Sequence, residues 1–216
     1  LLGIYVFQFF FVFLLTMRIR ETENTLILQD QIEQRTGIRV ETLSNSEQRF
    51  LDYKSIASKG ETFRRIIEEK TAILDIGGGS IQISLFDKDT LVSTQNLKLG
   101  VLRLRESMNL LNASLSQYRT LIGEIVESQL SVYKKLYLKD RVISNLIVVG
   151  DHIGDAVHKN VMTRADFLNF YDDMIYRSDE DAAGRCEVPE DVISVLRPSL
   201  VVYRCFLEAA DVENIW

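Results

Sequence analysis

The sequence predicts an α/β fold, and three observations lead to this prediction. A polar, helix-like stretch at residues 21–34 is followed by strand-like residues 38–43. Two apolar segments, 72–76 and 81–86, flank three consecutive glycines, and a further apolar segment lies at 145–149. Helical stretches that alternate with buried strands are typical of α/β domains.

The first fifteen residues are almost wholly apolar and rich in Phe and Val. They are shorter than the ~20 residues that a helix needs to span a bilayer, and no basic region precedes them as in a signal peptide. We expect a buried strand or the scar of a truncation, and the absence of an initial Met indicates an incomplete chain. A membrane anchor is the alternative, because Arg18 and Arg20 follow.

Local signals then predict the elements in order. The helix over 21–34 stops before Gly37, residues 44–47 form a capping box that opens a second helix, and the charged range 59–70 is expected to be a linker. The apolar residues from Leu115 to Ile125 share one face of a long helix. The last signals are a strand at 145–149, a cap at Thr163–Asp166 and a final helix that Pro198 opens and that ends near Asp211.

Composition bounds the function. The 216 residues allow one large or two small domains, and the net charge of -6 gives no electrostatic reason to expect nucleic acid as a partner. Cys186 and Cys205 lack the spacing of a metal or secretory motif and are expected to be reduced thiols. His152 and His158 have no companion ligands for a zinc site.

The segment from Asp75 to Ser80 carries the chemistry. Gly77, Gly78 and Gly79 can take positive φ and have no Cβ, so their backbone N–H groups can converge on an anion, and the Ser80 hydroxyl adds a donor. The Asp75 carboxylate would repel a bare phosphate, so we expect it beside a divalent cation or orienting an attacking water. A glycine-rich hairpin with a strand-end acid is the alternative. Neither a Walker loop nor a Rossmann fingerprint occurs.

These motifs occur in the order of a known family. The segments Thr16–Asn24, Thr36–Ile38 and Leu43–Glu47, followed by the glycine loop, resemble the Ppx/GppA family of exopolyphosphatases and guanosine pentaphosphate phosphohydrolases. The resemblance extends from about residue 16 to residue 216 and implies an actin-like, ribonuclease-H-like α/β fold with its site between two lobes. It implies a remnant of the first lobe at 1–58, a linker at 59–70 and a second lobe at 71–216.

The resemblance also assigns site residues. Gly77, Gly78, Gly79 and Ser80 match the phosphate loop of the second lobe, and Asp75 matches the acid associated with Mg²⁺. Arg20 matches an arginine that contacts substrate phosphate, with a structural salt bridge as the alternative.

Several positions depart from the family pattern. Gln48 stands where the catalytic glutamate is expected, so Glu47 would have to serve as the base, unless it only caps a helix. Gln82 replaces an acid, Gly150-Asp-His152 replaces a glycine-threonine turn, and Val192 replaces an arginine. The first phosphate loop of the family has no counterpart before Thr16, so this polypeptide alone is not expected to close a competent site.

Three functions remain open at this point. The first is a Mg²⁺-assisted hydrolase that acts on polyphosphate or a guanosine pentaphosphate-like nucleotide, and the second is a phosphate-binding module without turnover. The third is a truncated product without independent function. The resemblance implies a cytoplasmic protein, with a homodimer as one possible assembly and no membrane partner.

Overall fold

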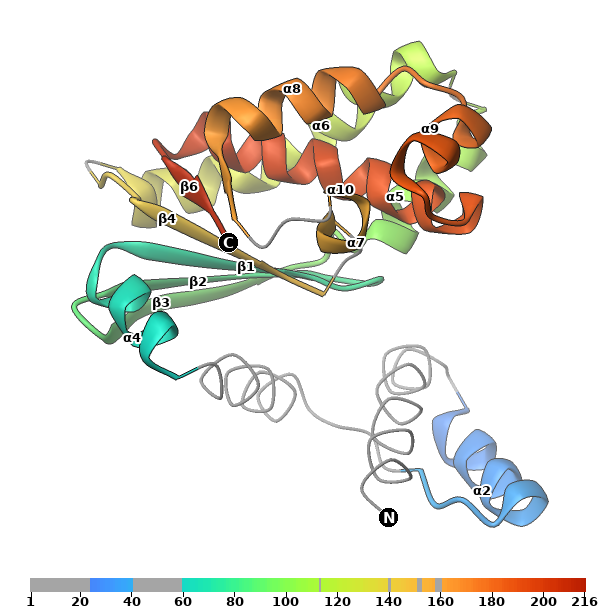
Figure 1. Cartoon of the computed structure of the whole chain (residues 1–216). Helices are drawn as coiled ribbons and strands as arrows, with labels where there is room; N and C mark the ends of the chain where they lie inside the picture. The colour runs from blue at the N-terminus through green and yellow to red at the C-terminus, as the bar shows by residue number, and fades with distance from the viewer. Residues whose placement is uncertain (1–23, 41–59, 113, 140, 151–152, 158–160) are drawn as a thin grey trace. The chain divides into compact units, whose positions relative to one another are not determined.

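The computed structural model describes residues 24–40, 60–112, 114–139, 141–150, 153–157 and 161–216. The chain divides into two compact units, Leu1–Gly60 and Glu61–Trp216, which are described separately (Figure 1). The predictions that fall on residues 1–23 and 41–59, including the apolar start and the capping-box helix, lie outside the described residues.

The first unit contributes one described helix, α2 (Thr25–Thr36). It ends at Gly37, whose φ of 68° is left-handed and whose N–H donates to the carbonyl of Glu33. No residue of α2 is buried, which confirms the predicted surface helix. Residues 38–40 are not in a strand, although the sequence predicts that a strand begins there.

The second unit is built on a six-stranded mixed sheet of order β3-β2-β1-β4-β6-β5. β1, β2 and β3 pair antiparallel, β1, β4 and β6 are parallel, and β5 pairs antiparallel with β6. The bounds are β1 Thr71–Ile76, β2 Ile81–Asp87, β3 Thr90–Leu97, β4 Asn145–Val149, β5 Met162–Thr163 and β6 Asn214–Ile215.

Helices cover both faces of this sheet. Figure 1 shows most of them stacked over one face, with α6 and α10 running side by side, and α4 on the other side of the strands. The bounds are α4 Glu61–Glu68, α5 Val101–Leu110, α6 Leu115–Tyr133, the π-helix η1 Lys134–Leu138, α7 Ile153–Val157, α8 Arg164–Met174, α9 Asp179–Cys186 and α10 Glu190–Ala209. Most of the range predicted as a linker is therefore helix α4.

The alternation of side chains along β1 divides the core in two. Leu74 and Ile76 belong to the main cluster under the larger layer of helices, whereas Ile73 points to the opposite face and is 2% exposed. On that opposite face, the buried residues Ile66 and Ile67 of α4 cover the sheet. Burial on both faces explains why β1 is a continuous apolar run rather than an alternating one.

The last long helix corrects one prediction. Pro198 does not open a helix but lies inside α10, which begins at Glu190 with Pro189 as its N-cap. Proline has no N–H to donate to the carbonyl of Ser194, four residues earlier. Extensive burial holds α10 together at this position, because residues 196–203 are all buried. The predicted end near Asp211 is confirmed within two residues, since α10 ends at Ala209.

The C-terminal residues pair with β4 inside the sheet. The backbone N–H of Trp216 donates to the carbonyl of Leu146 at 2.8 Å, and that of Val148 donates to the carbonyl of Trp216 at 2.9 Å. The indole N–H of Trp216 donates to Asn145 Oδ1 at 3.1 Å, and the Asn145 amide donates to Glu69 Oε2 at 2.9 Å. The buried polar residue Asn145 thus links the C-terminal strand to the segment that follows α4.

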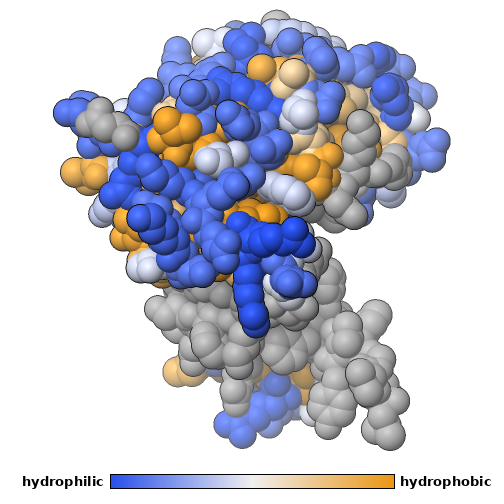
Figure 2. Space-filling model, turned by 60° about the vertical axis from the view of Figure 1, so that its left-hand side comes forward, coloured by the Kyte–Doolittle hydropathy of each residue, from blue (hydrophilic) through white to orange (hydrophobic). Residues whose placement is uncertain are grey.

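The cysteines lie in the interior of the second unit. Cys186 and Cys205 are free thiols, as the sequence predicts, and both are buried. Among the described helices, none is long and apolar enough to cross a membrane. On the face shown in Figure 2, hydrophobic residues form separate patches between hydrophilic ones.

Candidate phosphate-binding site

The three glycines and Ser80 form the tight connection of the β1–β2 hairpin. Ile76 and Ile81 are the last cross-strand partners, and the Gly77 N–H donates to the carbonyl of Ser80 at 2.9 Å. Gly78 and Gly79 therefore occupy the tip of the turn. The predicted pair of strands joined at the glycines is confirmed.

The carbonyl groups of this glycine loop face the N-terminus of α5. The N–H groups of Val101 and Leu102 donate to the carbonyls of Gly77 and Gly78 at 3.1 and 2.9 Å. The Arg103 N–H also approaches the Gly78 carbonyl at 3.4 Å, and Arg103 Nε donates to the carbonyl of Gly79 at 3.0 Å. Three consecutive loop carbonyls thus accept hydrogen bonds from the first turn of one helix.

These contacts fix the direction of the loop amides. In a trans peptide unit the N–H points opposite to the C=O, and the described residues contain no cis peptide bond. Because the carbonyls of Gly77, Gly78 and Gly79 point to α5, the N–H groups of Gly78, Gly79 and Ser80 point away from α5. Successive N–H groups on one side of a turn form the kind of concavity that binds anions in proteins.

The close approach between loop and helix requires glycine at position 100. A Cβ on Gly100 would lie 2.2 Å from the carbonyl carbon and oxygen of Gly78 and from the nitrogen of Gly79. Among the described glycines, the positive φ values are at Gly37, Gly60 and Gly150. The glycine that the close approach requires is therefore Gly100, and the loop glycines do not adopt the positive φ that the sequence suggests.

Asp75 lies next to the loop at the end of β1, where β4 also ends. The two strands are parallel, with Asp75 opposite Val149, so Gly150 directly follows the partner of Asp75. Gly150 has a φ of 90°, and a Cβ there would lie 2.8 Å from Asp75 Oδ1 and 3.0 Å from the carbonyl oxygen of Ile76. The backbone at Gly150 thus packs against the carboxylate and limits where it can point.

The carboxylate of Asp75 is the candidate cation ligand beside the loop. Among the described residues no group of three or more His, Cys, Asp and Glu side chains could hold a metal ion. Mg²⁺ is usually held by one or two carboxylates together with waters and substrate phosphates. A carboxylate beside a phosphate loop fits that mode of binding.

Of the other residues that the sequence analysis singled out, Gln82 and Val192 lie in the described part of the chain. Gln82 is the cross-strand partner of Asp75, so the two side chains lie on the same face of the hairpin. Val192 lies half-buried in the first turn of α10. The residues outside the described ranges are Arg20, Glu47, Gln48, His152 and His158.

Sequence reasoning assigned no role to Gly100, Arg103 or the helix they belong to. Helix α5 has Gly100 as its N-cap and no side-chain cap, so the usual signal of a helix start is missing. The first intrahelical bond is from Leu104 N–H to the Gly100 carbonyl, and the three preceding N–H groups are those that meet the loop. The only signal in the sequence is the close succession of Gly100 and two arginines after a strand.

Comparison with known proteins decides the family. The sequence model of the Ppx/GppA phosphatase family matches residues 13–209. The chain belongs to the Ppx/GppA phosphatase family. No curated protein matches the sequence significantly.

Solved structures show the same fold. A Ppx/GppA family member from Aquifex aeolicus matches with a TM-score of 0.69 and 17% identity, covering 91% of this chain and 66% of that one. An exopolyphosphatase from Cytophaga hutchinsonii matches with a TM-score of 0.66 and 16% identity, covering 91% and 67%. An exopolyphosphatase-like protein gives a TM-score of 0.73 at 16% identity, covering 91% and 68%. The chain thus has the mixed α/β fold predicted for this family and spans about two thirds of the length of these structures.

Proposed function

We propose that this chain binds the terminal phosphate of a phosphoanhydride at the loop Gly77–Ser80 and takes part in its hydrolysis. The observation that carries the proposal is the orientation of the loop amides. The hydrogen bonds of the loop carbonyls to α5 turn three consecutive N–H groups to the side away from that helix. Family membership supports a phosphohydrolase, and polyphosphate or a guanosine pentaphosphate-like nucleotide is the substrate class we propose.

The chemistry requires mainly positioning and charge stabilisation. Phosphoryl transfer spreads negative charge over the equatorial oxygens, and preorganised donors stabilise that charge. The loop amides and the Ser80 hydroxyl would bind these oxygens, while Asp75 would hold Mg²⁺, which neutralises phosphate charge when bound. We further propose that Arg20 contacts phosphate and that Glu47 orients water.

A second candidate function rests on one residue. Gln48 stands where the family resemblance expects the catalytic glutamate, and a neutral amide cannot accept the proton of the attacking water. The chain would then bind phosphate without turning it over. Both functions predict binding, and only the first predicts release of orthophosphate.

The experiment measures orthophosphate release from polyphosphate and from guanosine pentaphosphate with Mg²⁺. It compares the native chain with Gly78→Asp, which places a carboxylate at the tip of the loop, and with Gln48→Glu. Gly123→Asp on α6 is the matched control, because a Cβ at Gly123 meets nothing within 4 Å.

The outcomes separate the candidates. Release that Gly78→Asp abolishes and Gly123→Asp preserves would support the hydrolase and a role for Glu47. Release only by Gln48→Glu would support the binding module. If neither the native chain nor Gln48→Glu releases orthophosphate and the native chain does not bind polyphosphate, both candidates are wrong.

A further inference from the structure

Helix α5 begins with N–H groups that most helices leave to water or to a side-chain cap. In this protein the N–H groups of Val101, Leu102 and Arg103 all meet carbonyls of the glycine loop, and Gly100 provides no side-chain cap. The loop and the helix therefore satisfy each other, although they are more than twenty positions apart in the sequence.

The dipoles of the two elements point in the same direction. The N-terminus of a helix carries a partial positive charge of about half an elementary charge. The peptide units of the loop accept at their oxygens from this helix end and present their N–H groups on the opposite side. Hydrogen bonds in such a chain polarise one another, so the positive end of α5 extends through the loop to its outer N–H groups.

Arg103 adds a full charge to this arrangement. Its Nε donates to the Gly79 carbonyl, while backbone N–H groups of α5 donate to the carbonyls of Gly77 and Gly78. A guanidinium presents its Nε donor in a fixed plane, which a lysine ammonium cannot reproduce. The Arg103 side chain thus orients the peptide unit that begins with the Gly79 carbonyl. The backbone of α5 orients the two units that begin with the carbonyls of Gly77 and Gly78.

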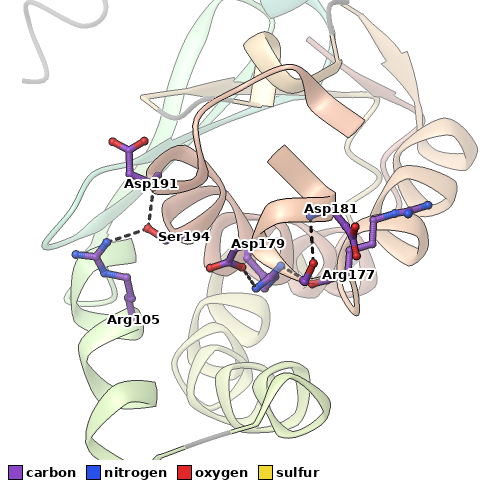
Figure 3. A network of polar contacts seen from close by, with 8 residues as sticks. Arg105, Arg177, Asp179, Asp181, Asp191 and Ser194 are labelled. Atoms are coloured by element: carbon purple, nitrogen blue, oxygen red, sulfur yellow. Dashed lines mark hydrogen bonds and ion pairs between the residues drawn. The ribbon is translucent and has the colours of Figure 1, made fainter. Parts of the chain in front are cut away.

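The other side of α5 is anchored in the fold. Figure 3 shows Arg105 pointing from α5 toward Ser194 on α10, and its Nη1 donates to Ser194 Oγ at 3.0 Å. The same hydroxyl donates to the carbonyl of Asp191 at 2.7 Å. Val101, Leu104 and Met108 are buried in the core. The helix end that meets the loop is thus held in place by the rest of the second unit.

We propose that α5 presets the glycine loop for phosphate, with Gly100 and Arg103 as positioning residues that hold its carbonyls inward and its N–H groups outward. This inference rests on the proposed function in one respect, namely that the ligand of the loop is a phosphate. It adds two residues to the site that do not touch phosphate themselves and act through the peptide units of the loop.

The test combines ligand binding with hydrogen exchange on the whole chain. Titration calorimetry with tripolyphosphate and Mg²⁺ compares the native chain with Gly100→Ala, Arg103→Met and Arg103→Lys. The matched controls are Gly123→Ala, which meets open space, and Arg141→Met. Arg141 is exposed on the segment leading to β4, which begins beside Thr71 at the end of β1 opposite the loop.

We expect about tenfold weaker binding for Gly100→Ala and about threefold to tenfold weaker binding for Arg103→Met. Arg103→Lys should resemble Arg103→Met, and both controls should bind like the native chain. Without ligand, the amides of residues 101–103 should exchange faster in Gly100→Ala and should be unchanged in Gly123→Ala. Arg103 is exposed, so its variants test the proposal even if Gly100→Ala does not fold.

Two results would overturn the proposal: native affinity in all three variants, or equal weakening by Arg141→Met. If the native chain itself does not bind tripolyphosphate, the proposed function fails. The exchange of residues 101–103 would then decide separately whether α5 fixes the loop, and native exchange in Gly100→Ala would refute that as well.

Discussion

At the scale of single residues, Gly150 matters because it has no Cβ, which leaves room for the carboxylate of Asp75. Its positive φ, and the short distance that would separate an added Cβ from Asp75 Oδ1, both exclude a larger residue. The backbone of the adjacent strand end therefore limits where the carboxylate of Asp75 can lie. Sequence reasoning could propose Asp75 and the glycine loop, because both are consecutive in the chain, but it could not foresee a contact that parallel pairing creates.

We expect Gly150→Ala to destabilise the fold by more than about 1 kcal/mol, since the new Cβ is strained at this φ and crowds Asp75. The matched control is Gly154→Ala in α7, where a Cβ meets nothing within 4 Å and alanine favours the helix. Urea denaturation measures both. Equal midpoints for the two variants would show that Gly150 is not constrained as described.

Tyr171 has a buried hydroxyl with no hydrogen-bond partner among the described residues. Its ring packs against Phe167 and under the guanidinium of Arg204, which lies 4.7 Å from the ring centroid. Tyr171→Phe keeps these ring contacts and removes the unpartnered oxygen. We expect a gain in unfolding free energy of about 1 kcal/mol at neutral pH, with the exposed Tyr176→Phe as the control.

The same substitution should change the response to alkaline pH. Burial raises the pKa of Tyr171 from 10.0 to about 12, against a lowering effect of Arg119 and Arg204. A raised pKa in the folded state means that its stabilising contribution is complete below pH 10 and is lost as the pH rises toward 12. The gain from Tyr171→Phe in urea midpoint should therefore be larger at pH 11 than at pH 8, and a constant gain would contradict the shift.

At the scale of elements, the contact between α9 and α10 depends on a buried arginine. Arg197 is 5% exposed, and its Nη1 and Nη2 donate to Asp179 Oδ1 at 2.6 Å and to the Arg177 carbonyl at 2.8 Å. Its Nε is buried with no partner among the described residues. The two ends of the ion pair are unequal, because Asp179 remains 45% exposed at its side chain.

This difference in exposure predicts that removing either partner of the ion pair lowers the free energy of unfolding by a different amount. Asp179→Ala leaves the guanidinium buried without its countercharge and should cost about 2 kcal/mol, whereas Arg197→Met leaves a carboxylate that water can reach and should cost less. Glu180→Ala is the control, since it also removes an acid from the first turn of α9 but is exposed. Thermal denaturation of the three variants measures the order, and a larger loss for Arg197→Met would contradict it.

The elements also show what a sequence can predict. The β1–β2 hairpin, β4, α6 and α8 were predictable because their apolar periodicity or capping box is local. β3 is a polar edge strand stabilised by pairing with β2, and α5 is capped by a distant loop, so neither has a local signal. Pro198 misled the prediction of α10 because burial outweighs the intrinsic cost of proline inside a helix.

At the scale of the whole molecule, the division at Gly60 separates the predicted site residues. Asp75 and the glycine loop lie in the second unit, whereas Arg20, Glu47 and Gln48 belong to the first. The second unit contains the complete six-stranded sheet and the main core cluster. The proposed phosphate-binding loop and the proposed water-orienting residue Glu47 therefore belong to different units.

We expect a fragment of residues 61–216 to unfold cooperatively and to bind tripolyphosphate, because the loop and α5 are both present. It should release no orthophosphate even where the full chain does, since the proposed water-orienting residue is absent. Circular dichroism, calorimetry and a phosphate assay measure the three properties. Failure to bind, with native-like unfolding, would show that the first unit contributes to the phosphate site.

The hydrogen bond between Trp216 and Asn145 has a practical consequence. Trp216 is the only tryptophan in the sequence, and its indole bonds Asn145 at the start of β4, whereas the glycine loop follows the other end of the parallel strand β1. Its intrinsic fluorescence therefore reports whether the C-terminal strand is paired with β4, independently of what occupies the loop. A phosphate titration should leave the emission maximum unchanged, while Asn145→Ala should shift it to longer wavelength, so the chain carries its own optical probe of an intact fold.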